Sequence, residues 1–253
     1  MLVVDWIKNI QAVVFDIGGT LLDFDRKESY TELKSGAALA RQYLVSLGHS
    51  PPPVNVYRRR VIARLARAYV WSRLTAAELD PMFELAQLHQ AMGIKLDDHK
   101  ANEVGRLLYS PNKALARAHP QTADALRALR SAGFKIGLIS NTVAPPSGIE
   151  DHLAQEGLLE YFSVRVYSCV ERVPKPNPRI FNAALDRLGV DANRALYVGD
   201  KPHIDVIGAH RVGMYAALRG TTMPTKPKYR PEILIRQICD LLEHFQIETL
   251  TSR

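Results

Sequence analysis

The sequence predicts an α/β protein whose parallel sheet is covered by helices on both faces. An apolar segment at residues 12–15 is followed, after residue 118, by apolar segments that alternate with helical ones. Strands that alternate with helices favour a parallel sheet, and strands buried on both faces read as continuous apolar runs. The composition fits a globular protein, since 47% of the 253 residues are hydrophobic and 23% are charged.

The elements of this core follow from the apolar runs and from the glycines beside them. We expect strands at residues 12–15, 134–139, 164–167, 195–198 and 215–218. We expect helices at residues 120–132, 180–188 and 234–245. Gly133 and Gly189 come directly after two of these helices, at the position where glycine commonly ends a helix.

Residues 29–118 show helical periodicity, with no convincing strand. Ile62, Leu65 and Tyr69 are spaced three and four residues apart, as on one face of a helix. The prolines at residues 51–53 mark a break before this helix. We therefore expect a Rossmann-like three-layer core with an α-helical cap domain inserted after the first strand. The expected bounds are residues 1–24 and 119–253 for the core and residues 25–118 for the cap.

Three polar residues come just after apolar strands, namely Asp16, Ser140 and Asp200. The carboxyl ends of parallel strands meet at one edge of a sheet, where open α/β sheets bind their ligands. We therefore expect the three side chains to converge in one crevice. A fourth residue, Lys175, lies in the segment VPKPNP, whose prolines stiffen the loop that carries the lysine.

In their order along the chain, these segments resemble the haloacid dehalogenase-like hydrolase superfamily. The matching segments are VFDIGGTL at residues 14–21, LISN at 138–141, VPKP at 173–176, and VGD at 198–200 with Asp205, Gly208, Ala209 and Gly213. The first and last segments are specific, whereas the serine and lysine segments gain weight from their order. The resemblance covers nearly the whole chain, because the inserted helices are similar to the helical cap of that family.

The resemblance implies a Mg²⁺-dependent phosphatase-like hydrolase of a small phosphorylated metabolite. Asp16 is then the nucleophile, and a carboxylate that forms an aspartyl-phosphate divides one difficult step into two. Ser140 and Lys175 are the other catalytic residues, because a hydroxyl and an ammonium can stabilise the charge that builds on the phosphoryl oxygens.

The same resemblance implies a phosphate-binding set and a metal site. The expected phosphate-binding residues are Gly18, Gly19, Thr20, Ser140, Asn141 and Lys175. The expected Mg²⁺ ligands are the carboxylates of Asp16, Asp200 and Asp205 and the backbone carbonyl of Gly18. This set suits Mg²⁺, which prefers oxygen ligands and keeps several waters.

Gly18 departs from the pattern of the family. Most of its phosphatases carry an aspartate two residues after the nucleophile, which protonates the leaving oxygen and then activates water. Glycine cannot transfer a proton, and positioned acid–base catalysis contributes about 10²–10⁴-fold in rate. Substitute acids to test are His203, since histidine is a common proton donor in catalysis, and Asp23 or Asp25, which follow the first motif.

Other readings of Gly18 follow from relatives that lack this acid. A dehalogenase needs no metal, whereas Asp200 and Asp205 resemble a complete metal segment. A phosphonatase-type enzyme needs a lysine in the cap, yet no lysine lies between Lys34 and Lys95. The main alternative is a catalytically attenuated member of the superfamily that binds a phosphorylated ligand or a protein partner.

Charge, cysteines and hydropathy bear on partners and location. The formal net charge of +7 favours anionic ligands. The arginines at residues 58–60, 64, 67 and 73 are interpreted as a solvated helix face, since no nucleic-acid-binding module is visible. The two cysteines form no disulfide framework, the N-terminus is a poor signal peptide, and no apolar run approaches the ~18 residues of a membrane span. We expect a cytoplasmic protein without a membrane or nucleic-acid partner, of unknown oligomeric state.

Overall fold

The computed structural model of the chain describes residues 5–24, 29–75, 80–142 and 144–247. The chain divides into two compact units. The first, called the core unit, comprises Met1–Asp23, Ala118–Asn141 and Leu153–Arg253. The second, called the helical unit, comprises Phe24–Arg117 and Thr142–His152. The segment Thr142–His152 therefore groups with the helices rather than with the core to which we assigned it, and the role of the helical unit as a cap stays a prediction.

The core unit contains a six-stranded sheet with the order β5-β4-β1-β6-β7-β8, and all of its paired strands are parallel. The strands are β1 (Ala12–Phe15), β4 (Lys135–Ser140), β5 (Val164–Tyr167), β6 (Ala195–Gly199), β7 (Tyr215–Arg219) and β8 (Ile233–Ile235). The predicted α/β fold with a Rossmann-like parallel sheet is confirmed. The chain turns to opposite sides of β1 to form β4 and β6, so β1 and β6 flank the point where this fold binds ligands.

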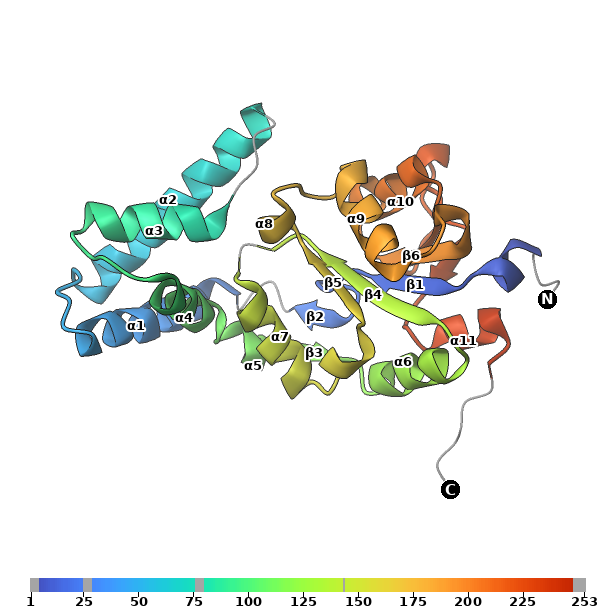
Figure 1. Ribbon diagram of the computed structural model, residues 1–253, viewed down its shortest axis with the longest axis horizontal. Helices are drawn as coiled ribbons and strands as arrows, with labels where there is room; N and C mark the ends of the chain where they lie inside the picture. The colour runs from blue at the N-terminus through green and yellow to red at the C-terminus, as the bar shows by residue number, and fades with distance from the viewer. Residues whose placement is uncertain (1–4, 25–28, 76–79, 143, 248–253) are drawn as a thin grey trace, which may run out of the picture. The chain divides into compact units, whose positions relative to one another are not determined.

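Helices cover both faces of this sheet, with α9 and α10 on one side and α6 and α11 on the other (Figure 1). The helices of the core unit are α6 (Thr122–Ser131), α8 (Ser168–Glu171), α9 (Pro178–Leu188), α10 (Ile207–Val212) and α11 (Asp240–Phe245), whereas most of α7 (Pro146–Gln155) belongs to the helical unit. Short turns of 3₁₀-helix occur at η1 (Asp5–Asn9), η2 (Leu159–Tyr161), η3 (Ala192–Arg194) and η5 (Pro227–Tyr229), and a π-helical turn at η4 (Pro202–Val206). The apolar face of α9, with Ile180, Phe181 and Ala184, packs against buried residues of the strands such as Val14 and Ile139.

The helical unit is built from α1 (Ser29–Ser46), α2 (Val54–Thr75), α3 (Pro81–Ala91), α4 (Asp98–Tyr109) and the short α5 (Asn112–Leu115). Its helices bury a separate apolar cluster that includes Leu44, Val61 and Leu85. On α2 the buried stripe runs through Val61, whereas Ile62, which we expected to face inward, is half-buried. None of the described helices is both long and apolar enough to cross a membrane.

Two further expectations from the sequence are wrong. Residues 234–245 do not form one helix, because Ile233–Ile235 pairs with β7 as strand β8 and the helix begins only at Asp240. The Asp240 carboxylate accepts hydrogen bonds from the backbone N–H groups of Arg236 and Gln237, which orders the turn between them. Residues 29–118 also end in a short strand, β3 (Ala116–Ala118), which pairs with β2 (Leu22–Phe24).

Candidate active site

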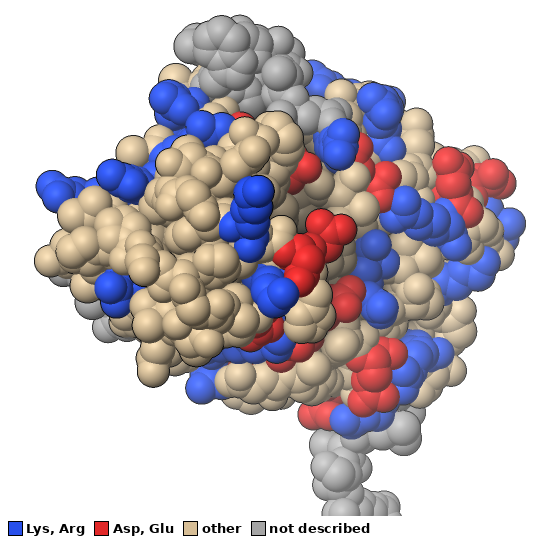
Figure 2. Space-filling model, turned by 60° about the vertical axis from the view of Figure 1, so that its left-hand side comes forward, with Lys and Arg blue, Asp and Glu red and all other residues tan. Residues whose placement is uncertain are grey.

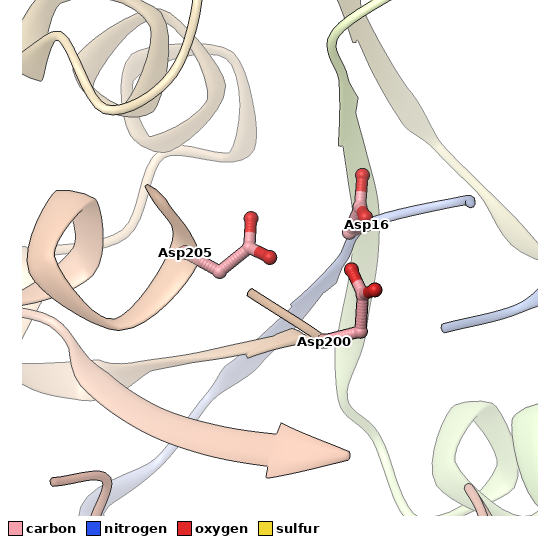
Figure 3. A group of neighbouring side chains, drawn as sticks. All are labelled: Asp16, Asp200 and Asp205. Atoms are coloured by element: carbon pink, nitrogen blue, oxygen red, sulfur yellow. The ribbon is translucent and has the colours of Figure 1, made fainter. Parts of the chain in front are cut away.

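Three carboxylates meet at the carboxyl edge of the sheet in the core unit. Asp16 follows β1, Asp200 follows β6, and Asp205 comes from the π-helical turn η4. One oxygen of each carboxylate lies within 4.8 Å of the other two, and the side chains face one another in Figure 3. Asp16 is 4% exposed and Asp205 is fully buried. The structure therefore brings together the three side chains that the sequence predicts as metal ligands.

Two glycines make room for these carboxylates. Gly19 has a φ angle of +82°, and a Cβ atom there would lie 2.4 Å from Oδ2 of Asp200. A Cβ atom at Gly199 would lie 2.4 Å from Cβ of Asp205. Only glycine combines the left-handed backbone with this close approach at residue 19. The glycines of both specific sequence segments thus leave room for acidic side chains, Gly19 for Asp200 of the other segment and Gly199 for Asp205 of its own.

The ammonium group of Lys175 lies among these carboxylates. It donates hydrogen bonds to Oδ1 of Asp16 at 2.7 Å and to Oδ1 of Asp205 at 2.8 Å. A third contact, at 2.8 Å, is with the hydroxyl of Tyr197. Because an ammonium has three N–H donors, these partners satisfy it completely, and the side chain is 2% exposed. Lys175 therefore acts as a buried counter-ion to the acidic cluster.

Burial and neighbouring charges shift the pKa values of Asp16 and Lys175. Burial raises the pKa of Asp16 to about 6, although the nearby Lys175 ammonium opposes the shift. Burial lowers the pKa of Lys175, but the carboxylates of Asp16 and Asp205 outweigh burial and the net shift is upward. Lys175 thus stays charged at neutral pH, and most of Asp16 is ionised there.

The backbone of Lys175 is held by Asn141. The Asn141 side chain donates from Nδ2 to the Lys175 carbonyl at 3.1 Å and accepts from the Lys175 N–H at 2.8 Å. This amide, which we expected among the phosphate-binding groups, thus fixes the loop that carries the lysine. Ser140 is the last residue of β4 and is 5% exposed, at the same edge of the sheet as Asp16.

Tyr197 also belongs to the candidate site, although the sequence did not predict it. The apolar run at residues 195–198 predicted only a buried strand there. The Tyr197 hydroxyl accepts from Lys175 and lies 3.4 Å from both Oδ1 of Asp205 and the Ile139 carbonyl, to either of which it can donate. Burial raises the pKa of Tyr197 well above its usual value, so the hydroxyl keeps its proton. The signal that could have found it is the alternation of side chains along a strand. Tyr197 and Gly199 lie on the same face of β6, and Asp205 packs against Gly199 on that face.

The loop after Asp16 is closed by its own backbone. The Gly19 N–H donates to the Leu22 carbonyl at 2.8 Å, and the N–H groups of Leu21 and Leu22 donate to the Ile17 carbonyl at 2.9 Å. Gly18 forms an isolated bridge with Leu22. The Thr20 hydroxyl is buried and has no hydrogen-bond partner among the described residues. A buried hydroxyl without a partner is costly, and a ligand oxygen would offset that cost.

The candidate substitutes for the missing acid lie in different environments. Asp23 forms an ion pair with Arg219, in which Nη2 lies 2.8 Å from Oδ2. His203 is exposed on η4, and Asp25 lies outside the described residues. Asp23 is therefore already engaged by a cation, whereas His203 is open to solvent.

The arginine-rich segment lies on α2 of the helical unit. Arg64 forms an ion pair with Glu84, and the side chain of Arg73 lies outside those that the structure describes. In Figure 2, basic and acidic side chains are interspersed at the centre and right of the view, whereas the left-hand part shows mostly basic ones. Solvated surfaces commonly carry such charges, and the absence of a nucleic-acid partner stays a prediction.

Comparison with known proteins establishes the family. Residues 10–213 match the haloacid dehalogenase-like hydrolases. The chain belongs to this hydrolase family. This haloacid dehalogenase-like hydrolase is similar in part to a glyceraldehyde 3-phosphate phosphatase of Methanopyrus kandleri. The two are 38% identical over 101 residues, which cover 40% of this chain and 42% of that relative. The match thus spans less than half of the curated relative.

Solved structures of the family match over nearly the full length. A HAD phosphatase from Thermococcus onnurineus is 25% identical, with a TM-score of 0.60, and the match covers 95% of this chain and all of that one. A 2-haloacid dehalogenase from Pseudomonas syringae is 23% identical, with a TM-score of 0.66 and coverage of 94% and 98%. Because enzymes of both activities share the fold, the fold alone does not select between them.

Proposed function

We propose that this hydrolase is a Mg²⁺-dependent phosphatase of a small phosphorylated metabolite, with Asp16 as the nucleophile. The observation that carries the proposal is the cluster of Asp16, Asp200 and Asp205 around one buried ammonium, that of Lys175. Lys201, whose Nζ lies 3.2 Å from Oδ1 of Asp200, is a more exposed second cation. Buried charges are stable only when they are paired, so the excess of negative charge favours a divalent cation here.

The donor set fits Mg²⁺. All three groups are hard oxygen ligands close to one another, and the Gly18 carbonyl is the fourth proposed ligand. Asp205 binds Lys175 through Oδ1 and accepts the Lys201 backbone N–H through Oδ2 at 2.9 Å, so it orients the lysine as well as facing the metal site. When bound, Mg²⁺ would neutralise negative charge between the nucleophile and the phosphoryl group.

The residues of the chain supply the remaining steps. Lys175 holds Oδ1 of Asp16, which orients the carboxylate for attack on phosphorus. Attack forms the Asp16–phosphate bond as the bond to the leaving oxygen breaks, and water then hydrolyses the aspartyl-phosphate. Ser140, Asn141, Lys175 and the segment Gly18–Gly19–Thr20 are the proposed phosphoryl-binding groups, and the buried Thr20 hydroxyl is an available donor.

Two observations favour a phosphatase over a dehalogenase. Relatives of the chain carry phosphatase names, among them the glyceraldehyde 3-phosphate phosphatase described above. Asp200 adds a carboxylate to the cluster, and dehalogenase chemistry needs no metal for which such a group would serve. The second candidate, an attenuated member that binds a phosphorylated ligand, is favoured by Gly18 and by the engagement of Asp23 with Arg219.

Phosphate release tests the proposal directly. We expect turnover of phenyl phosphate with Mg²⁺ and none with a chelator, and Mg²⁺ should also raise the melting temperature.

Because burial raises the pKa of Asp16 to about 6, a proton competes with the metal below that pH. The Mg²⁺ concentration for half-maximal activity should therefore fall as the pH rises through about 6. A rate of phosphate release that is independent of the Mg²⁺ concentration at every pH would contradict the proposed metal site.

The hydroxyl of Tyr197 provides a prediction for the same reaction. We expect Tyr197→Phe to lower kcat about tenfold with little change in KM, because a hydrogen bond to a charged group contributes about 1.5 kcal/mol and the variant leaves one Lys175 donor unpaired. Tyr215→Phe is the matched control, since that ring stacks on Trp6 at the opposite edge of the sheet. An unchanged kcat in Tyr197→Phe would show that the hydroxyl does not position Lys175.

A further inference from the structure

Arg219, the last residue of β7, joins separate segments at the edge of the site. Its Nη1 donates to the Gly19 carbonyl at 3.0 Å, and its Nη2 donates to Oδ2 of Asp23 at 2.8 Å. Nη1 also contacts Oδ1 of Asp23, and Nε donates to the Arg236 carbonyl at 3.2 Å. A guanidinium presents its donors in a rigid planar fork, so these bonds hold the loop after β1 at a set distance from the ends of β7 and β8.

Both contacts of Arg219 to the loop follow one peptide group in the chain. The Gly18 carbonyl belongs to the planar peptide whose N–H, on Gly19, donates to the Leu22 carbonyl. Arg219 binds just beyond this peptide at the Gly19 carbonyl, and again at Asp23, next to Leu22. Gly19 also packs closely against the Asp200 carboxylate. The peptide that carries the Gly18 carbonyl is therefore held from several directions.

We propose that Arg219 is a positioning residue for the metal site, which holds the loop after Asp16 so that the Gly18 carbonyl can serve as a ligand together with Asp16 and Asp200. This proposal rests on the metal site of the proposed function. Asp23 has the supporting role of aiming the guanidinium through both carboxylate oxygens. Residues that orient metal ligands in this way commonly change metal affinity about 10–100-fold when they are replaced.

A surface ion pair without function is the alternative explanation of Arg219. The Asp23 side chain is 55% exposed, and pairs of that kind contribute little to stability. The Arg219 side chain is only 16% exposed, however, and one of its donors is aimed at a backbone carbonyl of the loop after Asp16. An ion pair that served only as surface charge would need no such bond.

Metal binding measured by calorimetry tests the proposal without relying on activity. We expect Arg219→Gln to weaken Mg²⁺ binding about tenfold or more, at the lower end of the range seen when groups that orient metal ligands are removed. Arg219→Lys should give an intermediate loss, because an ammonium cannot reproduce the fork. Asp23→Asn should give a smaller loss, because one oxygen acceptor remains. The half-activating Mg²⁺ concentration should rise in the same order, with kcat largely restored at saturating Mg²⁺.

The matched control is Arg187→Gln, which removes a side chain paired with Glu171 at 2.6 Å, away from the catalytic loop. It should leave Mg²⁺ affinity unchanged. Arg219→Gln and Arg219→Lys could both bind Mg²⁺ as tightly as the unaltered protein, with or without a change in melting temperature. Arg219 would then be only structural, and its positioning role would be refuted while the proposed metal site would stand. If the unaltered protein binds no Mg²⁺, the proposed metal site fails and this proposal fails with it.

Discussion

Replacing Asp16 by asparagine is expected to abolish phosphate release while the fold is retained. Asparagine has nearly the same shape, and its amide oxygen can still accept the hydrogen bond from Lys175 that Oδ1 of Asp16 now accepts. It lacks the negative charge needed to attack phosphorus and to bind a cation. Because removal of an enzyme's nucleophile can cost up to about 10⁶-fold in kcat, we expect a loss of about 10³-fold or more.

The measurement is phosphate release from phenyl phosphate with saturating Mg²⁺, alongside melting curves with and without the metal. The melting temperature of Asp16→Asn without metal should stay close to that of the unaltered protein, and its increase with Mg²⁺ should disappear. Asp186→Asn, an exposed change on α9, is the control and should behave as the unaltered protein. Equal, trace release in both proteins would favour the alternative of a phospho-ligand-binding member.

The second large effect is a strong dependence of the rate on the leaving group. Gly18 cannot protonate a departing oxygen, and Asp23 is engaged by Arg219. Acetyl phosphate and phenyl phosphate release weakly basic oxygens, whereas ethyl phosphate releases a strongly basic alkoxide. We expect the first two to react about 10²–10⁴-fold faster than ethyl phosphate, which is the range that positioned acid catalysis provides.

Two variants distinguish the sources of a proton. Gly18→Asp should accelerate ethyl phosphate hydrolysis relative to phenyl phosphate, because it places a carboxyl group two residues after the nucleophile. His203→Ala tests the exposed histidine of η4 and should leave the leaving-group dependence unchanged. If the unaltered protein hydrolyses ethyl phosphate as fast as phenyl phosphate, a proton donor is present. A steep dependence in His203→Ala would then identify the histidine as that donor.

The acidic cluster shows what a local sequence pattern can predict. The apolar runs before Asp16 and Asp200 predict buried parallel strands, and parallel strands place their ends at one edge. The structure puts both carboxylates there, with Asp205 beside them. The same pattern misread residues 234–245, because Ile233 and Ile235 are buried as alternate residues of a strand at the edge of the sheet.

The partners of these groups were not readable in the same way. In the sequence, Tyr197 looks like any large residue of a buried strand. Its hydroxyl joins the site only because it accepts a hydrogen bond from Lys175, which lies 22 residues earlier in the chain. The Asn141 amide, which is predicted to bind the phosphoryl group, also holds the backbone of Lys175, and no local pattern indicates that contact. Arg219 and Gly19 are 200 residues apart, so no local period connects them.

The sequence by itself determined the parallel α/β core, the edge of the sheet at which the candidate site lies, and the acidic and basic residues that gather there. Hydrophobic periodicity reports burial, and burial determines which strands are interior and where they end. The tertiary structure alone determined which groups satisfy the Lys175 ammonium, which amide binds the Lys175 backbone, and which cation holds the loop after Asp16. Those contacts join segments distant in sequence, and a hydrogen bond depends on distances and angles that form only when the segments pack together.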